Sequence, residues 1–260
     1  MTDYRQTILE MYHHLVQKHP DLASHFEAIA ATAQGKGYGA NSIEQEITVI
    51  LNLLKKQPTL AIDIGGNVGD YTAELRRKNQ TLEIHIFEPS ATNIQKLNAR
   101  YGNDSLIKIV PYAVSSTSGS ATLFSNKPGS GLGSLTKRRL DHFNIPFEAK
   151  ETINTLRFED YWKATLGSRQ LDIVKMDIEG HELSALKGFG TAIDATNVLQ
   201  FEFGGTNIDT RTYFQDFWYF FKDHNFDIYR ITPFGNEKIA QYTEKDEFFS
   251  TTNYIAVNRR

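Results

Sequence analysis

The sequence predicts an α/β fold in which helices cover both faces of a mostly parallel sheet. From residue 59 onward, short apolar runs alternate with helix-like segments, as in repeated strand–helix units. The first apolar run leads into a glycine-rich turn and the second ends in a carboxylate, which is typical of sheets that bind a nucleotide beyond their strand ends. A chain of 260 residues is long enough for one such domain with an appended region.

The apolar runs predict seven strands, at residues 59–64, 83–87, 106–110, 171–176, 198–203, 227–232 and 251–257. Helices are expected at residues 68–78, 90–100, 157–165, 181–187 and 210–224. The aromatic residues between 214 and 221 recur at helical spacing, which indicates core and interface packing. Residues 236–248 are polar and weakly periodic, so an antiparallel final strand is expected instead of a crossover helix.

The first part of the chain predicts helices over residues 3–56. Apolar residues repeat at intervals of three and four from Ile8 to Val16, a second helix follows Pro20, and a third follows Asn41-Ser42 after a glycine-rich loop at residues 35–39. Pro58 ends this region. We therefore expect a helical region at 1–57 and a sheet domain at 58–260, and we leave open a homo-oligomer formed through the helices.

Composition limits the classes of function. The hydrophobic content of 40% and charged content of 23% are those of a globular protein, and a net charge of −3 does not favour nucleic-acid binding. The chain has no cysteine, which excludes disulfides and a cysteine nucleophile. No apolar run reaches the ~18 residues of a membrane span, and the N-terminus lacks the apolar core of a signal peptide. A soluble, cytoplasmic protein is expected.

The turn after the first predicted strand, Asp63-Ile64-Gly65-Gly66-Asn67-Val68-Gly69, is the main binding signal. Its glycines allow close approach of backbone to a ligand, and the free N–H groups of the following helix attract anionic groups. Glu88 ends the second strand, where a carboxylate can accept hydrogen bonds from a ribose diol.

The spacing of this turn argues against a dinucleotide. Counted from Gly65, Asn67 and Asp70 stand where the dinucleotide fingerprint requires its second and third glycines. The site therefore suits a nucleoside with a zwitterionic tail, such as S-adenosylmethionine. The alternative is that the glycines only form a tight turn.

A second dense signal begins where the strand at 171–176 ends. Asp177, Glu179, His181 and Glu182 follow within a few positions, and parallel strands bring such ends to the same edge of a sheet. His181, Asp177 or Glu202 could act as a base, because His has a suitable ordinary pKa and acids at strand ends lie near the ligand. Alternatively, Asp177 and Glu179 could bind a divalent cation such as Mg²⁺.

The stretch from Ser115 to Lys150 interrupts the alternation of strands and helices. Residues 121–124 could form a short strand, and residues 128–135 contain three glycines. We expect residues 126–144 to contact the acceptor, together with the strand ends that carry Asp177 and Glu202; an ordinary surface loop is the alternative. The basic run Lys137-Arg138-Arg139 is interpreted as a solvated helix face.

Taken together, these motifs resemble the FkbM-type methyltransferases. The resemblance covers about residues 59–205 and rests on residues 63–69, Phe87-Glu88-Pro89, Ala113-Val114-Ser115, Ser134-Leu135 and Lys175-Met176-Asp177-Ile178-Glu179-Gly180 with Glu182. It implies the class I S-adenosylmethionine-dependent fold, a Rossmann-like seven-stranded sheet with an antiparallel last strand. It also implies methylation of hydroxyl groups, often on glycan sugars or natural products. Gly66 stands where alanine is common, a departure expected to matter little.

The sequence hypothesis is therefore an O-methyltransferase that acts on a hydroxyl group, of a sugar or glycan or else of a natural product. Glu88 is expected to hold the ribose, and Tyr112 and Ala113 to flank adenine. The remaining cofactor contacts are expected from Asp63, Gly65, Gly66, Asn67, Val68, Gly69 and Asp177. Two rivals remain, an NAD-dependent oxidoreductase and a non-catalytic cofactor-binding protein. The acceptor, the methylated position and the identity of the base are not fixed by the sequence.

Overall fold

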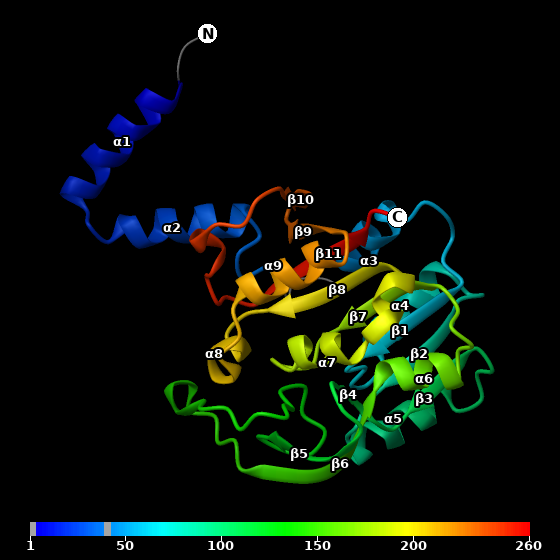
Figure 1. Ribbon diagram of the computed structural model, residues 1–260. Coiled ribbons are helices and arrows are strands. Elements are labelled where there is room, and N and C mark those ends of the chain that lie inside the picture. The colour runs from blue at the N-terminus through cyan, green and yellow to red at the C-terminus, as the bar shows by residue number, and fades with distance from the viewer. Residues whose placement is uncertain (1–3, 39–42) are drawn as a thin grey trace.

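The computed structural model describes residues 4–38 and 43–260, and its centre is an eight-stranded sheet (Figure 1). The strand order is β10-β9-β11-β8-β7-β1-β2-β3. The strands are β1 (Leu60–Ile64), β2 (Glu83–Phe87), β3 (Ile107–Val110), β7 (Leu171–Met176), β8 (Thr196–Phe203), β9 (Phe226–Thr232), β10 (Gly235–Ile239) and β11 (Thr252–Asn258). Gly39 and the predicted helix start at Asn41-Ser42 lie outside the described residues.

The pairing of the strands matches most of the sequence prediction. β1 pairs in parallel with β2 on one side and β7 on the other, and β3 and β8 extend the parallel part. β11 lies antiparallel between β8 and β9, so the predicted antiparallel last strand is confirmed. All seven predicted strands are present, and β10 is an eighth strand that pairs antiparallel with β9.

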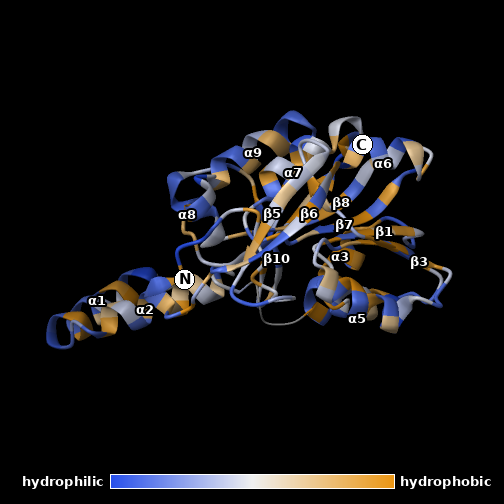
Figure 2. Ribbon diagram, turned by 90° about the horizontal axis from the view of Figure 1, so that it is seen from below, coloured by the Kyte–Doolittle hydropathy of each residue, from blue (hydrophilic) through white to orange (hydrophobic). Residues whose placement is uncertain are grey.

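Helices cover both faces of the sheet, as Figure 2 shows. The helices α3 (Ile43–Leu53), α4 (Asp70–Lys78) and α5 (Ala91–Tyr101) supply apolar side chains to one core. On the opposite face, α6 (Phe158–Ala164), α7 (Glu182–Gly188) and α9 (Phe214–Asp223) supply the other core. The strands between the two layers are largely hydrophobic, as expected for parallel strands that are buried on both sides.

The aromatic run in α9 packs as the sequence predicted. Phe217 stacks on Phe201 of β8 with ring centroids 5.1 Å apart, and Phe214, Phe217, Trp218 and Phe221 are buried. Burial of each ring contributes roughly 1.5–3 kcal/mol. The helix predicted at 210–224 begins later, at Phe214 of α9, because Tyr213 and Asp216 form a capping box there; Thr210 ends a separate short helix, α8 (Thr206–Thr210).

The third N-terminal helix belongs to the sheet domain. Ile47 and Ile50 of α3 are fully buried in the same core cluster as strand residues such as Ile84. The predicted boundary at residue 57 therefore does not separate this helix from the sheet.

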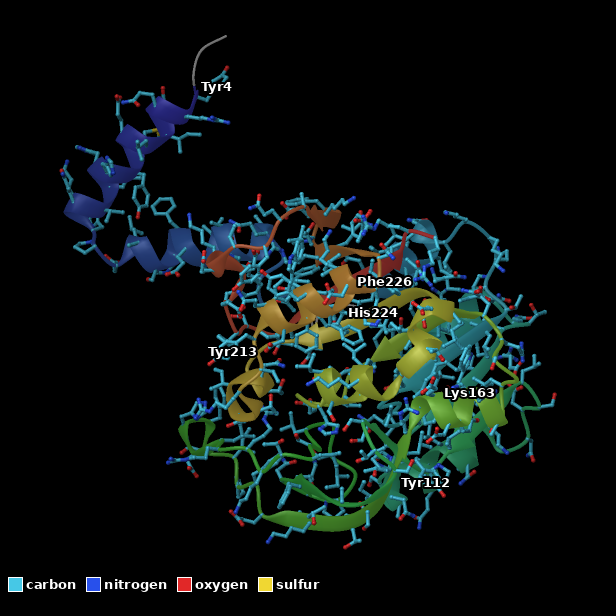
Figure 3. The ribbon with its side chains drawn as sticks, in the orientation of Figure 1. Tyr4, Tyr112, Lys163, Tyr213, His224 and Phe226 are labelled. Carbon is cyan, nitrogen blue, oxygen red and sulfur yellow. The ribbon has the colours of Figure 1, made fainter. Side chains whose placement is uncertain are left out.

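The first two helices form an arm that projects from the body of the protein (Figure 1). Neither α1 (Tyr4–Lys18) nor α2 (Leu22–Ala33) has a buried residue, and Figure 3 shows Tyr4 at the far end of the arm. Large apolar side chains are exposed along it, including Ile8 (65%), Met11 (59%) and Ile29 (67%). Within residues 4–38 and 43–260, no helix combines the length and apolar character needed to cross a bilayer.

A smaller sheet is formed by the stretch that interrupts the alternation. It contains β4 (Ala113–Ser115), β6 (Ala149–Arg157) and β5 (Gly119–Ser125) in that order, with β4 parallel and β5 antiparallel to β6. The predicted short strand at 121–124 is part of β5. Three 3₁₀ helices complete the described fold, at Asp141–Phe143, Gly190–Ala195 and Glu244–Asp246.

Candidate active site

A cavity of about 700 Å³, partly open to solvent, lies beyond the carboxyl ends of β1, β2 and β7. Its wall includes Gly65 and Asn67 after β1, Glu88 after β2, and Asp177 after β7. β1 lies between β2 and β7, so this is the point where strand order reverses and where open α/β sheets bind ligands.

The glycine turn packs the strand ends closely together. Gly65 has a φ of 80°, and a Cβ at this position would clash with the carbonyl oxygen of Asp177. The N–H groups of Gly65 and Gly66 donate to the carbonyl of Phe87 at 2.9 and 3.1 Å. A Cβ on Gly66 would clash with Cγ2 of Ile86, so the packing here favours the glycine that this chain carries.

Glu88 is buried at the cavity and already accepts three hydrogen bonds. The N–H groups of Asn67 and Ser90 each donate to its carboxylate at 2.9 Å, and Asn93 Nδ2 donates at 3.4 Å. Burial raises the pKa of Glu88 to about 7 despite these donors. The carboxylate is therefore held in place at the end of β2, where the sequence predicted a ribose-binding acid.

Three residues of the cavity wall carry buried polar atoms without a partner. Asn67 Oδ1, Ser90 Oγ and Asn93 Oδ1 make no hydrogen bond within the described part of the chain. Buried polar groups are nearly always paired in native proteins, so such atoms indicate a polar ligand or ordered water. Together with the Glu88 carboxylate, this set fits a ligand with several hydroxyl and amino groups, such as a nucleoside.

Other predicted cofactor residues lie behind the wall. Asp63 is fully buried, accepts a hydrogen bond from Thr72 Oγ1 at 2.7 Å, and has its pKa raised by burial. The Nζ atom of Lys175 lies 3.9 Å from Asp63 and 3.2 Å from Asp177; burial opposes its charge, but these acids raise the pKa of the lysine. Of the ten predicted contacts, Gly65, Asn67, Glu88, Tyr112, Ala113 and Asp177 line the cavity, whereas Asp63, Gly66, Val68 and Gly69 do not.

The turn after β7 presents three ionisable side chains to the cavity, those of Asp177, Glu179 and His181. Burial lowers the pKa of His181, and its Nε2 lies 3.0 Å from Ser115 Oγ. Glu182 points back into the turn, where its Oε1 accepts from the N–H groups of Ile178 (2.9 Å) and Gly180 (3.2 Å).

Glu202, a predicted base, does not line the cavity although it lies at the end of β8. Burial, with repulsion from Asp177 and the other nearby acids, raises the pKa of Glu202 well above its ordinary value. The structure thus brings His181 and Asp177 to the cavity and leaves Glu202 outside its wall.

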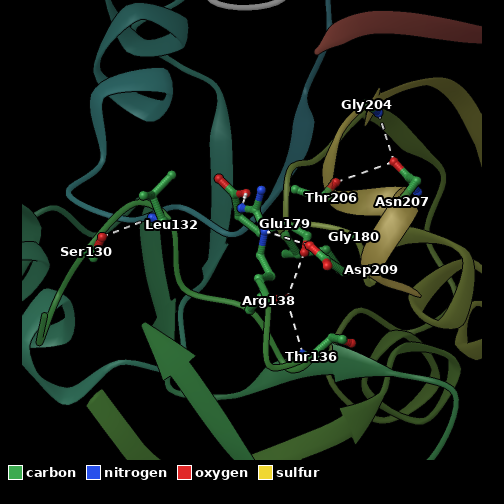
Figure 4. A network of polar contacts seen from close by, with 12 residues as sticks. Ser130, Leu132, Thr136, Arg138, Glu179, Gly180, Gly204, Thr206, Asn207 and Asp209 are labelled. Carbon is green, nitrogen blue, oxygen red and sulfur yellow. Dashed lines mark hydrogen bonds and ion pairs between the residues drawn. The ribbon is translucent and has the colours of Figure 1, made fainter. Parts of the chain in front are cut away.

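Arg138 lies in the segment 126–144 that was expected to contact the acceptor, but the sequence did not predict its ion pairs. Its guanidinium lies 2.8 Å from Glu179 Oε2 and 3.4 Å from Asp209 Oδ2, and its side chain is nearly buried (Figure 4). The interpretation of Arg138 as part of a solvated helix face is therefore wrong. Ser134 Oγ donates to the carbonyl of Glu179 at 2.8 Å, so two residues of the loop between β5 and β6 hold Glu179.

The same loop covers the side of the cavity that holds Glu88. The wall includes Gly129, Ser130, Gly131, Gly133 and Leu135. A Cβ on Gly131 would lie 3.2 Å from Asn67 Nδ2, and one on Gly129 would lie 2.9 Å from Asn93 Oδ1. The glycines indicated that this backbone approaches another group closely, but the sequence did not indicate that these groups are the side chains of Asn67 and Asn93.

Three further wall residues, Leu123, Ser125 and Glu151, come from the small sheet and were also missed. Glu151 reaches across to α5, where its Oε1 accepts from the N–H of Ala91 at 2.7 Å.

The alternative of a Mg²⁺ site is not supported. Within the described ranges, no group of three or more His, Cys, Asp or Glu side chains is arranged to hold a metal ion. The two acids considered for the metal each have a cationic partner, because Asp177 pairs with Lys175 and Glu179 with Arg138.

Comparisons with known proteins match this chain to a family model and to several methyltransferases. The family model described as "Methyltransferase FkbM domain" matches residues 63–228. The methyltransferase sdnD of Sordaria araneosa is 30% identical in an alignment of 152 positions that covers 49% of this chain and 59% of that protein. The 2-O-methyltransferase NoeI of Sinorhizobium fredii is 23% identical over 59% of this chain and 67% of its own length.

Two further proteins extend the comparison. The hexuronic acid methyltransferase AglP of Haloferax volcanii is 25% identical over 60% of each chain. The matched region thus spans about three fifths of sdnD and of AglP. The crystal structure of the methyltransferase FkbM from Methylobacillus flagellatus is similar with a TM-score of 0.47 and 17% identity, over 91% of this chain and 60% of that one.

Proposed function

The chain belongs to the FkbM methyltransferase family, and we propose that it transfers a methyl group from S-adenosylmethionine to a hydroxyl group of a sugar or glycan. The observation that carries this proposal is the buried Glu88 carboxylate at the cavity, surrounded by the unpartnered polar atoms of Asn67, Ser90 and Asn93. A carboxylate in this place can accept both hydrogen bonds of a ribose diol.

Each part of the cofactor has a suitable wall residue. We assign the ribose to Glu88, the methionine part to the backbone of Gly65 and to Asn67, and the adenine ring to the side of the cavity formed by Tyr112 and Ala113. Asp63 and Lys175 hold the strand ends from behind, since Lys175 Nζ lies 3.5 Å from the carbonyl of Gly65. When bound, S-adenosylmethionine supplies a methyl group made electrophilic by its sulfonium.

The rest of the chemistry belongs to the chain. The wall has to align the acceptor oxygen with the methyl group, exclude water and accept a proton, because an alcohol is a weak nucleophile until a base removes its proton. Asp177 and His181 remain candidate bases because both line the cavity. Glu202 would act only through another group, because it lies outside the wall.

The sugar as acceptor is supported by the names of two relatives, a 2-O-methyltransferase and a hexuronic acid methyltransferase. The cavity wall includes Ser125 of β5 and Ser130 of the following loop, whose hydroxyl groups can bind sugar hydroxyls.

A two-stage experiment tests the proposal. Calorimetry should detect binding of S-adenosylmethionine and S-adenosylhomocysteine but not of NAD. Labelled S-adenosylmethionine is then incubated with neutral glycosides, uronic acid glycosides and non-sugar natural-product alcohols, and the products are identified by mass spectrometry. Tighter binding of NAD would favour an oxidoreductase, binding without transfer to any acceptor would favour a non-catalytic protein, and transfer only to non-sugar alcohols would overturn the sugar assignment.

A further inference from the structure

The turn that carries Glu179 is built to hold one side chain at the cavity. Glu179 has a φ of 54°, a left-handed conformation that costs a non-glycine residue on the order of 1 kcal/mol and persists only where the surroundings enforce it. Glu182 accepts hydrogen bonds from the backbone on both sides of Glu179, at Ile178 and Gly180, while Ser134 donates to the carbonyl of Glu179 itself.

The two carboxylate oxygens of Glu179 differ in their surroundings. Oε2 lies 2.8 Å from the NH1 group of Arg138, which fixes the orientation of the carboxylate (Figure 4). No hydrogen bond to Oε1 is found among the residues that the structure describes, and Glu179 is one of the residues that line the cavity. One oxygen is therefore anchored, and the other is available to a ligand.

Arg138 has a second acidic partner, which matters once Glu179 gains a proton. Removing one member of a buried ion pair normally leaves the other charge uncompensated at a large cost. Here Asp209 Oδ2 lies 3.4 Å from Arg138 Nε, so the guanidinium keeps a carboxylate partner when Glu179 becomes neutral. The arrangement thus tolerates a change in the charge of Glu179.

The other acidic and basic groups of the cavity wall are less suited to accept a proton. Asp177 is engaged by the buried ammonium group of Lys175 at 3.2 Å, and burial lowers the pKa of His181, which makes it a weaker base. Burial, reinforced by the neighbouring Asp177 and opposed by Arg138, raises the pKa of Glu179 to about 8. A base with a pKa near the working pH is the most effective in proton transfer.

We propose that Glu179 is the base that accepts the proton of the acceptor hydroxyl, and that Arg138 positions its carboxylate; this rests on the proposed methyl transfer. As the bond between the acceptor oxygen and the methyl carbon forms and the methyl–sulfur bond breaks, the hydroxyl proton passes to Glu179 Oε1. The electron pair of the broken bond stays on sulfur, which becomes an uncharged thioether. Arg138, held by Asp209, acts through Glu179 and does not touch the acceptor.

The first test compares Glu179→Gln, His181→Ala and the control Arg139→Gln in the full chain, with an acceptor identified by the labelling panel. Gln can still accept a hydrogen bond from Arg138, so the fold is preserved, and Arg139 has an 89% exposed side chain. Glu179→Gln should lower kcat by ~10²-fold or more while S-adenosylhomocysteine binds within about threefold of the unmodified protein. The control should leave kcat unchanged. Full kcat in Glu179→Gln, or a larger loss in His181→Ala, would overturn the assignment.

The second test needs no acceptor. Side-chain carboxyl groups labelled with ¹³C are titrated by NMR in the unmodified protein, in Glu179→Gln and in Arg138→Gln. We expect one carboxyl that titrates near pH 8, is missing in Glu179→Gln, and shifts to higher pH in Arg138→Gln because the opposing cation is gone. A Glu179 carboxyl that titrates below pH 5 would refute the inference. Failure of the unmodified protein to bind S-adenosylmethionine would refute the proposed function instead, so the two failures are distinguishable.

Discussion

Glu88 gives the sharpest prediction about the cofactor, because its charge state and its contacts are both defined. Burial raises the pKa of Glu88 to about 7. Two hydroxyl groups of a ribose can donate to the carboxylate but not equally to the carboxylic acid, so binding should favour the ionised form. The affinity for the cofactor should therefore be highest above the pKa of Glu88 and should fall as the pH decreases through that pKa.

The magnitudes follow from the contacts. One pH unit below a titrating pKa reduces the ionised fraction about tenfold, so the affinity for S-adenosylhomocysteine should fall about tenfold from pH 8 to pH 6. Glu88→Ala removes hydrogen bonds to a charged group, a loss of about 1.5–3 kcal/mol, or roughly 10- to 150-fold in Kd. It also leaves the N–H groups of Asn67 and Ser90 without their acceptor, so the loop after β1 should loosen as well.

The assay is isothermal titration calorimetry with S-adenosylhomocysteine from pH 6 to pH 8. Glu88→Gln should bind weakly with little dependence on pH, since it has no carboxylate to ionise. Glu83→Gln is the matched control, because Glu83 stands at the opposite end of the same strand, β2, and should leave Kd within about twofold. Unchanged affinity in Glu88→Ala, or equal affinity of the unmodified protein at pH 6 and pH 8, would show that this carboxylate does not hold the ligand.

Three other predictions concern stability and assembly. Burial raises the pKa of Glu182 to about 7 and that of Glu179 to about 8, above the ordinary 4.5. The folded apoprotein therefore binds more protons than the unfolded chain near neutral pH, and its stability decreases as the pH rises. Differential scanning calorimetry should show a melting temperature that falls from pH 7 to pH 8.5, and that falls less in Glu179→Gln. Gly66→Ala should lower the free energy of unfolding by about 1–3 kcal/mol in urea titrations, because the added methyl group clashes with Ile86. The double variant Gly66→Ala with Ile86→Ala should lose less stability than the sum of the two single variants, and strict additivity would contradict the clash. Light scattering should give the mass of a dimer for the full chain and of a monomer when residues 1–33 are removed. The reason is that helices as short as α1 and α2 are marginally stable alone, and their apolar faces need a partner. A monomeric full chain would contradict this prediction.

What the sequence predicted correctly depends on contacts that are local or follow from a repeated pattern. The seven strands are apolar runs bounded by turns, and the position of Glu88 near the glycine turn could be predicted because a second strand in such a fold ends beside the first. β10 escaped prediction because Asn236, Glu237 and Lys238 give it no apolar pattern, and its backbone pairing with β9 defines it. Local sequence patterns thus predicted the seven apolar strands but not the polar edge strand β10.

The parts that were missed depend on pairs distant in the sequence. Arg138 stands between two other charged residues in the sequence and looks like a surface residue until the fold brings Glu179 and Asp209 to it. Likewise, nothing near residue 202 in the sequence shows that Glu202 lies outside the cavity wall, because that wall is formed by residues from other parts of the chain. Charge and spacing in the sequence identified the candidate residues, but choosing the base among them required knowledge of their partners in the fold.

The last prediction concerns the loop between β5 and β6, which the sequence assigned to the acceptor alone. Gly131 belongs to the cavity wall, and a side chain there would approach Asn67 Nδ2 at 3.2 Å, on the side that also holds Glu88. Gly131→Val should therefore weaken S-adenosylhomocysteine binding as well as raise the acceptor KM, because the added methyl groups press on Asn67. Gly119→Val is the matched control, since the nearest atom to a Cβ on Gly119 in β5 is 4.0 Å away.

Deletion of residues 128–135 is a stronger test of whether the loop serves the cofactor as well as the acceptor. It removes Gly131 together with Ser134, whose hydroxyl donates to the carbonyl of Glu179, so one change loosens both the cofactor side and the turn after β7. Cofactor affinity and kcat should therefore fall together. If calorimetry instead finds full affinity in both the deletion and Gly131→Val while only the acceptor KM rises, the loop serves the acceptor alone, and its contact with Asn67 has no part in binding the cofactor.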